Sequence, residues 1–258
     1  MIKIGGNIID EEAKLQAFLA EFASLHQPRI LIHGGGKLAT RLAEKLGIEQ
    51  KMVDGRRITD AETLKIVTMV YAGFINKHIV AKLQALQCNA LGLCGADGDV
   101  ILAHKRQHPV LDYGFVGDVD NVNADLIQNL LGRKIALVFA PITHDQQGNL
   151  LNTNADTIAQ EIARGMAGRY EVKLIYSFEK SGVLLDANDD STVIPELTPS
   201  YYQQLKTKQK IFAGMIPKLD NAFAALDSGV KKVCIGKAEE LTRLINGQAG
   251  TTILNPSR

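Results

Sequence analysis

Short apolar runs alternate along the chain with longer segments in which apolar residues recur every three or four positions. Apolar runs of four to eight residues between turn signals are typical of buried strands, and the three-to-four spacing is typical of helices that face a core. The pattern predicts strands at residues 1–4, 29–33, 90–94, 100–104, 135–142, 172–176, 233–235 and 251–254. It predicts helices at residues 11–25, 38–46, 60–86, 126–131, 156–166, 201–206, 217–226 and 239–245.

Strands that alternate with helices in this way imply parallel pairing through helical crossovers. The sequence therefore predicts the α/β class, with an open, mostly parallel sheet sandwiched between helix layers. A glycine-rich stretch at residues 165–169 lies between a predicted helix and a predicted strand, where few contacts need to cross. We expect a lobe boundary there, with an N-terminal lobe at 1–168, a C-terminal lobe at 169–258 and one sheet running through both.

Composition narrows the possible functions. Of 258 residues, 46% are hydrophobic and 22% are charged, which is typical of a folded, water-soluble protein. Lys and Arg total 29 against 28 Asp and Glu, so the chain lacks the basic excess of most nucleic-acid-binding proteins. No apolar run is long enough to cross a bilayer, no secretion signal is visible, and the three cysteines have no metal-ligand spacing. We expect a cytoplasmic protein that acts on small molecules, with no nucleic-acid or membrane partner.

Two glycine-rich turns follow predicted strands. Lys3 precedes Gly5 and Gly6, and His33 precedes Gly34, Gly35 and Gly36. Glycines at strand ends let a phosphate approach backbone N–H groups, and the start of the next helix favours an anion. Both turns are candidate phosphate sites, with Lys3 as the accompanying cation and His33 in a structural role.

The second glycine turn leaves one alternative open. The phosphate-loop pattern fails, because Leu38 stands where a Ser or Thr is needed after Gly36-Lys37. The dinucleotide pattern fits better, since Gly34-x-Gly36-x-x-Ala39 follows a strand and Asp54 lies about twenty residues on. A nicotinamide-dependent oxidoreductase is therefore the alternative enzyme.

Four polar residues are further candidates. Arg57 stands between a turn and a capped helix, where its guanidinium could hold a substrate carboxylate. Asn152 and Asp156 belong to a short polar cluster that opens a helix. Lys218 follows Pro217 in a first helical turn, where a cation opposes the helix dipole unless an anion offsets it.

Six motifs, in order, resemble the amino acid kinase family. They are Lys-x-Gly-Gly at residues 3–6, His-Gly-Gly-Gly at 33–36, Gly-x-Arg-Ile-Thr at 55–59, Gly-Phe-Val-Gly at 114–117, Asn-x-Asn-Ala-Asp at 152–156 and Gly-Met-Ile-Pro-Lys at 214–218. Each is weak alone, but six in register over nearly the whole chain are specific. The resemblance implies the α/β sandwich, an N-terminal lobe for the substrate and dimerisation, and a C-terminal lobe for ATP.

The resemblance also implies an activity. It is most specific for the members that phosphorylate the side-chain carboxylate of an N-acyl-L-glutamate in arginine biosynthesis, with acetyl as the default acyl group and succinyl as a larger possibility. Lys3 and Lys218 would stabilise the transferring phosphoryl group, and Asp156 would orient both lysines. Gly35, Gly36, Arg57 and Asn152 would contact the substrate. Mg²⁺ would arrive with ATP, and the chain itself would hold no metal.

The nucleotide side departs from the family pattern. Residues 177–184 are one residue longer than expected and lack the usual aspartate. The resemblance still implies nucleotide contacts at Ser177, Gly182, Leu184, Lys210, Ile211 and Phe212. It also implies a homodimer formed through the helix after Thr59. A sensor that binds acyl-glutamate without catalysis is the non-enzyme alternative.

Overall fold

The structure is a computed structural model that describes residues 1–53, 56–211 and 215–254. Its helices are α1 (Gly6–Asp10), α2 (Glu12–Ser24), α3 (Gly36–Lys45), α4 (Ala61–Thr68), η1 (Met69–Ile75), α5 (Asn76–Ala85), η2 (Asp97–Asp99), α6 (Ala124–Gly132), α7 (Ala155–Met166), η3 (Asp190–Thr192), α8 (Pro199–Thr207), α9 (Ile216–Asp227), η5 (Ala238–Glu240) and α10 (Leu241–Asn246). None of the helices in the described ranges is long and apolar enough to span a membrane.

The main sheet has eight strands in the order β12-β14-β13-β11-β1-β2-β8-β5. Their bounds are β1 (Ile2–Ile4), β2 (Ile30–His33), β5 (Ala90–Leu93), β8 (Ala136–Phe139), β11 (Lys173–Phe178), β12 (Glu196–Leu197), β13 (Lys232–Lys237) and β14 (Thr251–Ile253). All neighbouring pairs are parallel except β13 with β14. The predicted α/β class with a mostly parallel sheet is confirmed.

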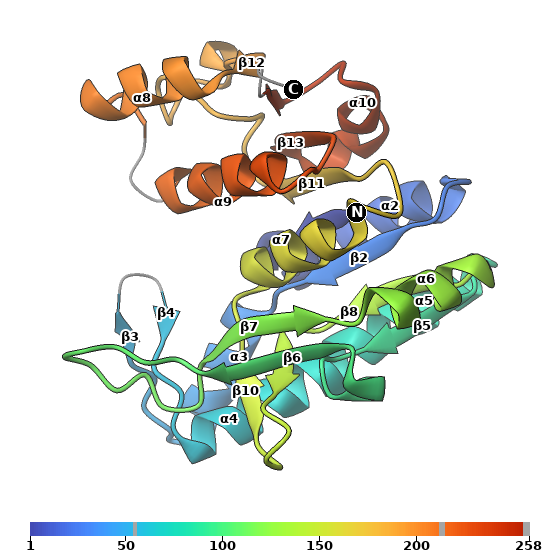
Figure 1. The fold of residues 1–258 in the computed structure, drawn as a ribbon, viewed down its shortest axis with the longest axis vertical. Coiled ribbons are helices and arrows are strands. Elements are labelled where there is room, and N and C mark those ends of the chain that lie inside the picture. The colour runs from blue at the N-terminus through green and yellow to red at the C-terminus, as the bar shows by residue number, and fades with distance from the viewer. Residues whose placement is uncertain (54–55, 212–214, 255–258) are drawn as a thin grey trace.

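Helices cover both faces of this sheet (Figure 1). One core holds Ile30 and Ile32 of β2 and packs against α6, α7, α8 and α9. The other core holds Leu31 and packs against α2, α3, the α4–η1–α5 helix and α10. Alternate residues of a strand therefore face opposite helix layers, as strand geometry requires. The division into lobes at residue 168 stays a prediction.

A second sheet of four strands extends one end of the molecule, in the order β10-β9-β6-β7. Its strands are β6 (Ile101–Lys105), β7 (Gly117–Val122), β9 (Ile142–His144) and β10 (Leu150–Asn152). The single strand predicted at 135–142 is wrong, because it divides between the two sheets. Pro141 explains the break, since it has no N–H to donate and keeps the residue before it extended. The chain thus passes from β8 into β9 and carries Asn152 on β10 toward the first sheet.

The dinucleotide-binding interpretation is wrong, because the strand that follows the glycine turn and its helix lies in a different sheet. It requires the strand after the glycine turn and its helix to pair within the same sheet. Here β3 (Met52–Val53) pairs with β4 (Arg56–Arg57) in a separate two-stranded sheet, and β2 instead neighbours β1 and β8. Asp54, the expected ribose ligand, lies outside the described residues.

Candidate functional site

The middle of the main sheet is a switch point, because β2 follows on one side of β1 and the chain later returns, after α7, to form β11 on the other side. Ile4 at the end of β1 is level with His33 of β2 and with Ser177 of β11. The Gly5 N–H donates to the Ser177 carbonyl at 3.2 Å, and a Cβ on Gly34 would lie 3.9 Å from the Ile4 carbonyl oxygen. The two glycine turns are therefore adjacent at the carboxyl ends of parallel strands, where open α/β sheets bind ligands.

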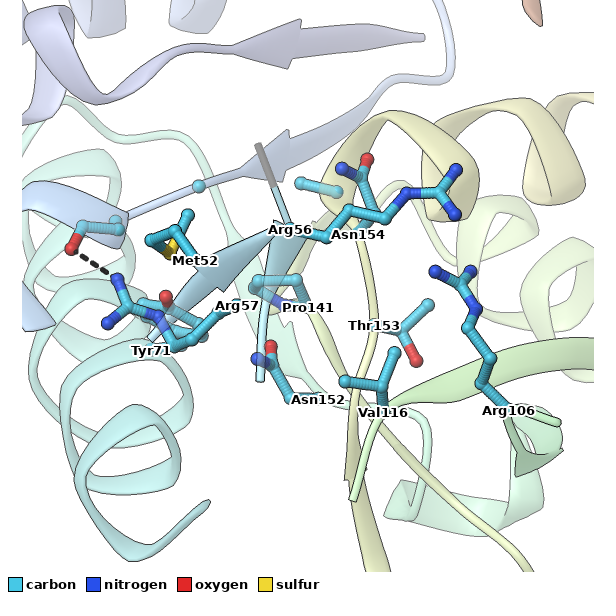
Figure 2. Close-up of a pocket in the computed structure, with 14 residues that line it drawn as sticks. Met52, Arg56, Arg57, Tyr71, Arg106, Val116, Pro141, Asn152, Thr153 and Asn154 are labelled. Atoms are coloured by element: carbon cyan, nitrogen blue, oxygen red, sulfur yellow. Dashed lines mark hydrogen bonds between the residues drawn. The ribbon is translucent and has the colours of Figure 1, made fainter. Parts of the chain in front are cut away.

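A first pocket of about 200 Å³ opens beside these turns (Figure 2). We call it the Arg57 pocket. Its lining comes from the glycine turn, the β3–β4 hairpin, η1, β6–β7 and the start of α7, and comprises Gly34, Gly35, Gly36, Met52, Arg56, Arg57, Tyr71, Arg106, Val116, Pro141, Asn152, Thr153, Asn154 and Ala155. All four predicted substrate contacts, Gly35, Gly36, Arg57 and Asn152, thus lie in one pocket.

Arg57 is a buried cation, with 8% of its surface exposed. Its Nη2 donates to the Gly36 carbonyl at 3.1 Å and to Thr40 Oγ1 at 2.9 Å, and its Nη1 donates to Gln50. Within the described ranges no carboxylate lies within 4.0 Å of the guanidinium. Because a buried charge needs a counter-charge, this arrangement favours an anionic ligand in the Arg57 pocket.

The glycine turn fits tightly against η1. Gly35 has φ of 150°, and a Cβ there would lie 2.3 Å from Ile75 Cδ1 and 3.0 Å from Tyr71 Cδ1. Glycine is therefore required at residue 35 for both its conformation and its packing. Gly36 begins α3 with no side-chain cap. The first backbone N–H groups of α3 are therefore available to a ligand in the pocket.

Asn152 and Asn154 have different tasks. Asn152 Nδ2 donates to Thr59 Oγ1 at 3.0 Å, which ties β10 to the start of the long helix. Asn154 is the N-cap of α7 and accepts from the N–H groups of Asp156 and Thr157. Asn154 therefore caps α7, and the Asp156 carboxylate is free to point elsewhere.

Asp156 binds the two lysines that the sequence singled out. Lys3 Nζ lies 2.7 Å from Asp156 Oδ1, and Lys218 Nζ lies 2.7 Å from Asp156 Oδ2. Ile2 and Ile4 of β1 point into one core, so Lys3 between them points toward the opposite layer, which contains α7 and α9. Residues 3, 156 and 218 are thus brought together by folding alone.

The cluster keeps a net positive charge. Burial alone would raise the pKa of Asp156, but the ammonium groups of Lys3 and Lys218 outweigh it and hold that pKa far below its usual range. Burial lowers the pKa of Lys3, and Asp156 opposes this effect. With Asp156 ionised, two ammonium groups face one carboxylate, and the excess charge can attract an anion.

A second pocket of about 360 Å³ lies on the other side of the cluster. We call it the Lys218 pocket. It is lined by Phe178, Glu179, Lys180, Gly182, Val183, Leu184, Ala187, Asn188, Ile211, Met215 and Lys218. Lys218 faces this pocket, while Asn154 and Ala155 next to Asp156 line the Arg57 pocket. The lysine–aspartate cluster therefore lies between the two pockets.

Three of the six predicted nucleotide contacts line the Lys218 pocket. Gly182, Leu184 and Ile211 line the Lys218 pocket. Ser177 is buried at the end of β11 and Lys210 is exposed; neither lines it. Phe212 lies outside the described residues. The roles of all six as nucleotide contacts stay predictions, and so do the phosphate contacts proposed for Gly5, Gly6 and Gly34, of which Gly34 lines the Arg57 pocket.

Several lining residues were not found from the sequence. Figure 2 shows Arg57 and Tyr71 on one side of the Arg57 pocket and the guanidinium groups of Arg56 and Arg106 on the other. Arg106 pairs with Asp118 on the neighbouring strand. Arg56 is adjacent to a motif residue and could have been proposed on that ground. Arg106 and Tyr71 belong to no motif, and only the fold brings them to the site.

His33 is buried at the base of the glycine turn. Its Nδ1 lies 2.8 Å from the Gly34 carbonyl oxygen, and its Nε2 lies 3.3 Å from Asn76 Nδ2. Nδ1 must donate and Nε2 must accept, so the ring is neutral. Burial lowers the pKa of His33 to about 4. The imidazole thus links the glycine turn to the first residue of α5, in the structural role that was expected.

The chain matches known proteins over nearly its full length. Fold and site together define an open α/β protein with two pockets at the carboxyl ends of its central strands. The family model "Amino acid kinase family" matches residues 1–237, and the chain belongs to this family. The family resemblance predicted from the motifs is confirmed, and the chain is an enzyme of the kinase type.

Two relatives and two solved structures illustrate the match. Acetylglutamate kinase of Parabacteroides distasonis is 56% identical over 241 residues, which are 93% of this chain and 94% of that protein. Acetylglutamate kinase of Cytophaga hutchinsonii is 55% identical over 249 residues, 95% and 94% of the two chains. The structure of smu.665 from Streptococcus mutans has a TM-score of 0.79 at 26% identity, covering 98% and 96%. The structure of N-acetylglutamate synthase from Neisseria gonorrhoeae has the same fold. Its TM-score is 0.82 at 21% identity, covering 98% of this chain and 58% of that one.

Neutral His33 predicts a pH dependence of stability. A histidine with an ordinary pKa of 6.5 when unfolded and about 4 when folded favours the folded state above pH 6.5, and this contribution is lost as the pH falls from 6.5 to 4. The loss amounts to about 3 kcal/mol of unfolding free energy. Urea unfolding of wild type and His33→Asn between pH 4 and 7 measures it, with exposed His26→Asn as control. The wild type should lose more stability over this range than His33→Asn, and equal slopes would contradict a buried neutral imidazole.

Proposed function

We propose that this protein transfers the γ-phosphoryl group of ATP to the side-chain carboxylate of an N-acyl-L-glutamate, in the cytoplasm and as a step of arginine biosynthesis. Acetyl is the acyl group that the names of its relatives give. The observation that carries the proposal is the Lys3–Asp156–Lys218 cluster between the two pockets. ATP would occupy the Lys218 pocket, and the acyl-glutamate would occupy the Arg57 pocket.

The Arg57 pocket suits a small dicarboxylate. Arg57 offers a buried cation without a carboxylate partner in the described part of the chain, and it would take the carboxylate on the α-carbon. Asn152 and the N–H groups after Gly35 supply hydrogen-bond donors. The side-chain carboxylate would then point toward Asn154 and Ala155, the residues before Asp156. The substrate would be oriented by Arg57 at one carboxylate and by the lysine–aspartate cluster at the other.

The chemistry needs no general base. An oxygen of the ionised side-chain carboxylate attacks the γ-phosphorus, the bond from that phosphorus to the β,γ-bridging oxygen breaks, and ADP leaves with the bond electrons. No proton is transferred, and the product is an acyl phosphate. Because both reactants are anions, catalysis must come from positioning and charge neutralisation. Lys3 and Lys218 supply the two positive charges, and Asp156 fixes their positions.

Mg²⁺ enters this proposal bound to the phosphates of ATP, as magnesium does in many kinases. Both oxygens of Asp156 contact lysines, so this carboxylate fits the orientation of ammonium groups better than the binding of a metal ion. When bound, Mg²⁺ would neutralise phosphate charge in the Lys218 pocket. The steps assigned to the protein's own residues are binding, orientation and charge stabilisation.

The acyl phosphate gives a direct test. Hydroxylamine converts an acyl phosphate to a hydroxamate, which is measured by its colour with Fe³⁺. The purified protein with MgATP and N-acetyl-L-glutamate should form hydroxamate in proportion to ADP release. N-succinyl-L-glutamate should be assayed beside it, because Arg56 and Arg106 give the pocket a second cationic side. Absence of hydroxamate with both substrates would overturn the proposal, and acyl-glutamate binding without turnover would favour the sensor alternative.

Loss of either clustered lysine should slow phosphoryl transfer. Lys3→Met and Lys218→Met keep most of the side-chain length and remove the charge. Each should lower kcat about 10²-fold, the scale for removing one stabiliser of a developing charge. Exposed Lys173, mutated to Met, is the control and should stay within about twofold of wild type. Steady-state ADP release measures this, and an unchanged kcat in either cluster variant would remove that lysine from the mechanism.

We also propose a homodimer formed through the α4–η1–α5 helix. Met69 and Phe74 on this helix are 55% and 62% exposed, and Leu46 at the end of α3 is 57% exposed. A mostly apolar hollow between α3 and η1 is lined by Leu38, Leu42, Met69, Val70 and Phe74, with Arg41 and Lys45 beside them. A second copy of the same surface would cover these groups, as in a two-fold symmetric interface.

A charge on this surface should separate the dimer. Phe74→Asp places a carboxylate in the middle of the apolar surface, so its mass by light scattering during gel filtration should fall from dimer to monomer. Val110→Asp is the control, because Val110 is 90% exposed on a loop. A wild-type protein that is itself monomeric, or a Phe74→Asp protein that stays dimeric, would contradict this interface.

A further inference from the structure

The long helix after Asp60 changes its geometry at the Arg57 pocket. The α4 and α5 segments are α-helical, but η1 between them has the wider π-helical hydrogen bonding. Short π-helical segments carry an extra residue and often occur at functional sites. Here the segment places Tyr71 and Ile75 against the glycine turn, while Met69 and Phe74 stay exposed. The irregular segment therefore determines which side chains reach the pocket.

Tyr71 is the polar side chain that η1 contributes to the pocket lining. It is 5% exposed, and its ring lies 3.0 Å from the position of a Cβ on Gly35. The ring thus packs under the glycine turn, and a Cβ on Gly36 would lie 4.0 Å from the Tyr71 hydroxyl and 3.8 Å from Arg57 Nη2. Figure 2 shows Tyr71 beside Arg57.

The Tyr71 hydroxyl lies beside the Arg57 guanidinium, whose positive charge opposes the rise in the Tyr71 pKa that burial causes, without outweighing it. Burial raises the pKa of the phenol, so it is protonated at neutral pH and has one O–H to donate. In the described ranges, none of the hydrogen bonds found uses that O–H as donor. A buried donor beside a buried, unpaired cation favours an oxygen anion as the missing partner.

We propose that Tyr71 is a further substrate-binding residue, which donates its O–H to the same carboxylate that Arg57 binds, the one that is not phosphorylated. This inference rests on the proposed function. The two side chains come from different elements, β4 and η1, and both line the Arg57 pocket. The paired donors recognise the α-carboxylate, while the lysine cluster is left for the reacting carboxylate.

Tyr71→Phe isolates this hydrogen bond. The ring stays in place against Gly35, so the protein should unfold at the wild-type temperature. A hydrogen bond to a charged group is the stronger kind. We therefore expect the Kd for N-acetyl-L-glutamate, measured by calorimetry without nucleotide, to rise about tenfold or more. KM should rise in parallel while kcat stays within about threefold. Tyr170→Phe, at the opposite end of the strands, is the matched control and should change neither constant.

A shortened substrate shows which group Tyr71 contacts. 4-Acetamidobutanoate is N-acetyl-glutamate without the α-carboxylate, and it keeps the carboxylate that would be phosphorylated. Its inhibition constant against N-acetyl-L-glutamate should be the same for wild type and Tyr71→Phe. If the substitution weakens both compounds equally, Tyr71 does not bind the α-carboxylate, and the proposal is overturned.

The outcomes separate this inference from the proposed function. If the wild type forms acyl phosphate and Tyr71→Phe binds N-acetyl-L-glutamate within twofold of wild type, only the role of Tyr71 fails. If N-succinyl-L-glutamate is the better substrate, the same comparison is made with that compound and with its analogue lacking the α-carboxylate. If the wild type neither binds nor phosphorylates any acyl-glutamate, the proposed function fails, and the role of Tyr71 fails with it.

Discussion

One buried carboxylate holds together groups from the two ends of the chain. Asp156 contacts Lys3 on the first strand and Lys218 at the start of α9. Without this carboxylate, two ammonium groups would face each other in a poorly solvated space, at a large electrostatic cost. The α7 helix that carries Asp156 packs against both β1 and α9, so the position of the carboxylate depends on the whole central layer.

That arrangement places opposite demands on folding and on chemistry. For folding, the carboxylate neutralises one of two buried positive charges. For the proposed phosphoryl transfer, the remaining positive charge would be the useful part, because it would offset the repulsion between two anionic reactants. In the proposed function, Arg57 would serve the same purpose in its own pocket. It is held by Gly36, Thr40 and Gln50, with no carboxylate nearby in the described residues. The protein keeps positive charges unneutralised where its ligands would bring negative ones.

Much of the fold could be predicted from local pattern. The buried runs at β1, β2 and β11 are visible in the sequence, as are the glycine turns after β1 and β2, and parallel pairing makes the ends of these strands neighbours. The break at Pro141 was missed, because residues 135–142 are apolar throughout and belong to two different sheets. The turn expected at Gly5-Gly6 leads directly into the short helix α1, which is held by the Asp10–Arg41 ion pair. Such long-range contacts leave no periodic signal.

The site was predictable only in part, for a similar reason. Lys3 was conspicuous as a charge in a buried strand, and Lys218 as a cation in a first helical turn, so both could be proposed from the sequence. Tyr71 and Arg106 look ordinary in the sequence, and their positions depend on a π-helical segment and on pairing between two sheets. On the nucleotide side, Glu179, Lys180 and Asn188 enter the lining through an irregular loop, which has no pattern to interpret.

The central claim is that both lysines act on the same phosphoryl group. A crystal structure with ADP, Mg²⁺, N-acetyl-L-glutamate and aluminium fluoride would test it most directly, because planar aluminium fluoride imitates a phosphoryl group during transfer. The account predicts that Nζ of Lys3 and Nζ of Lys218 each lie about 3 Å from a fluoride of the same group, between the substrate carboxylate and ADP. An aluminium fluoride group that contacts neither lysine, or a bound substrate on the far side of Asp156 from ADP, would contradict it.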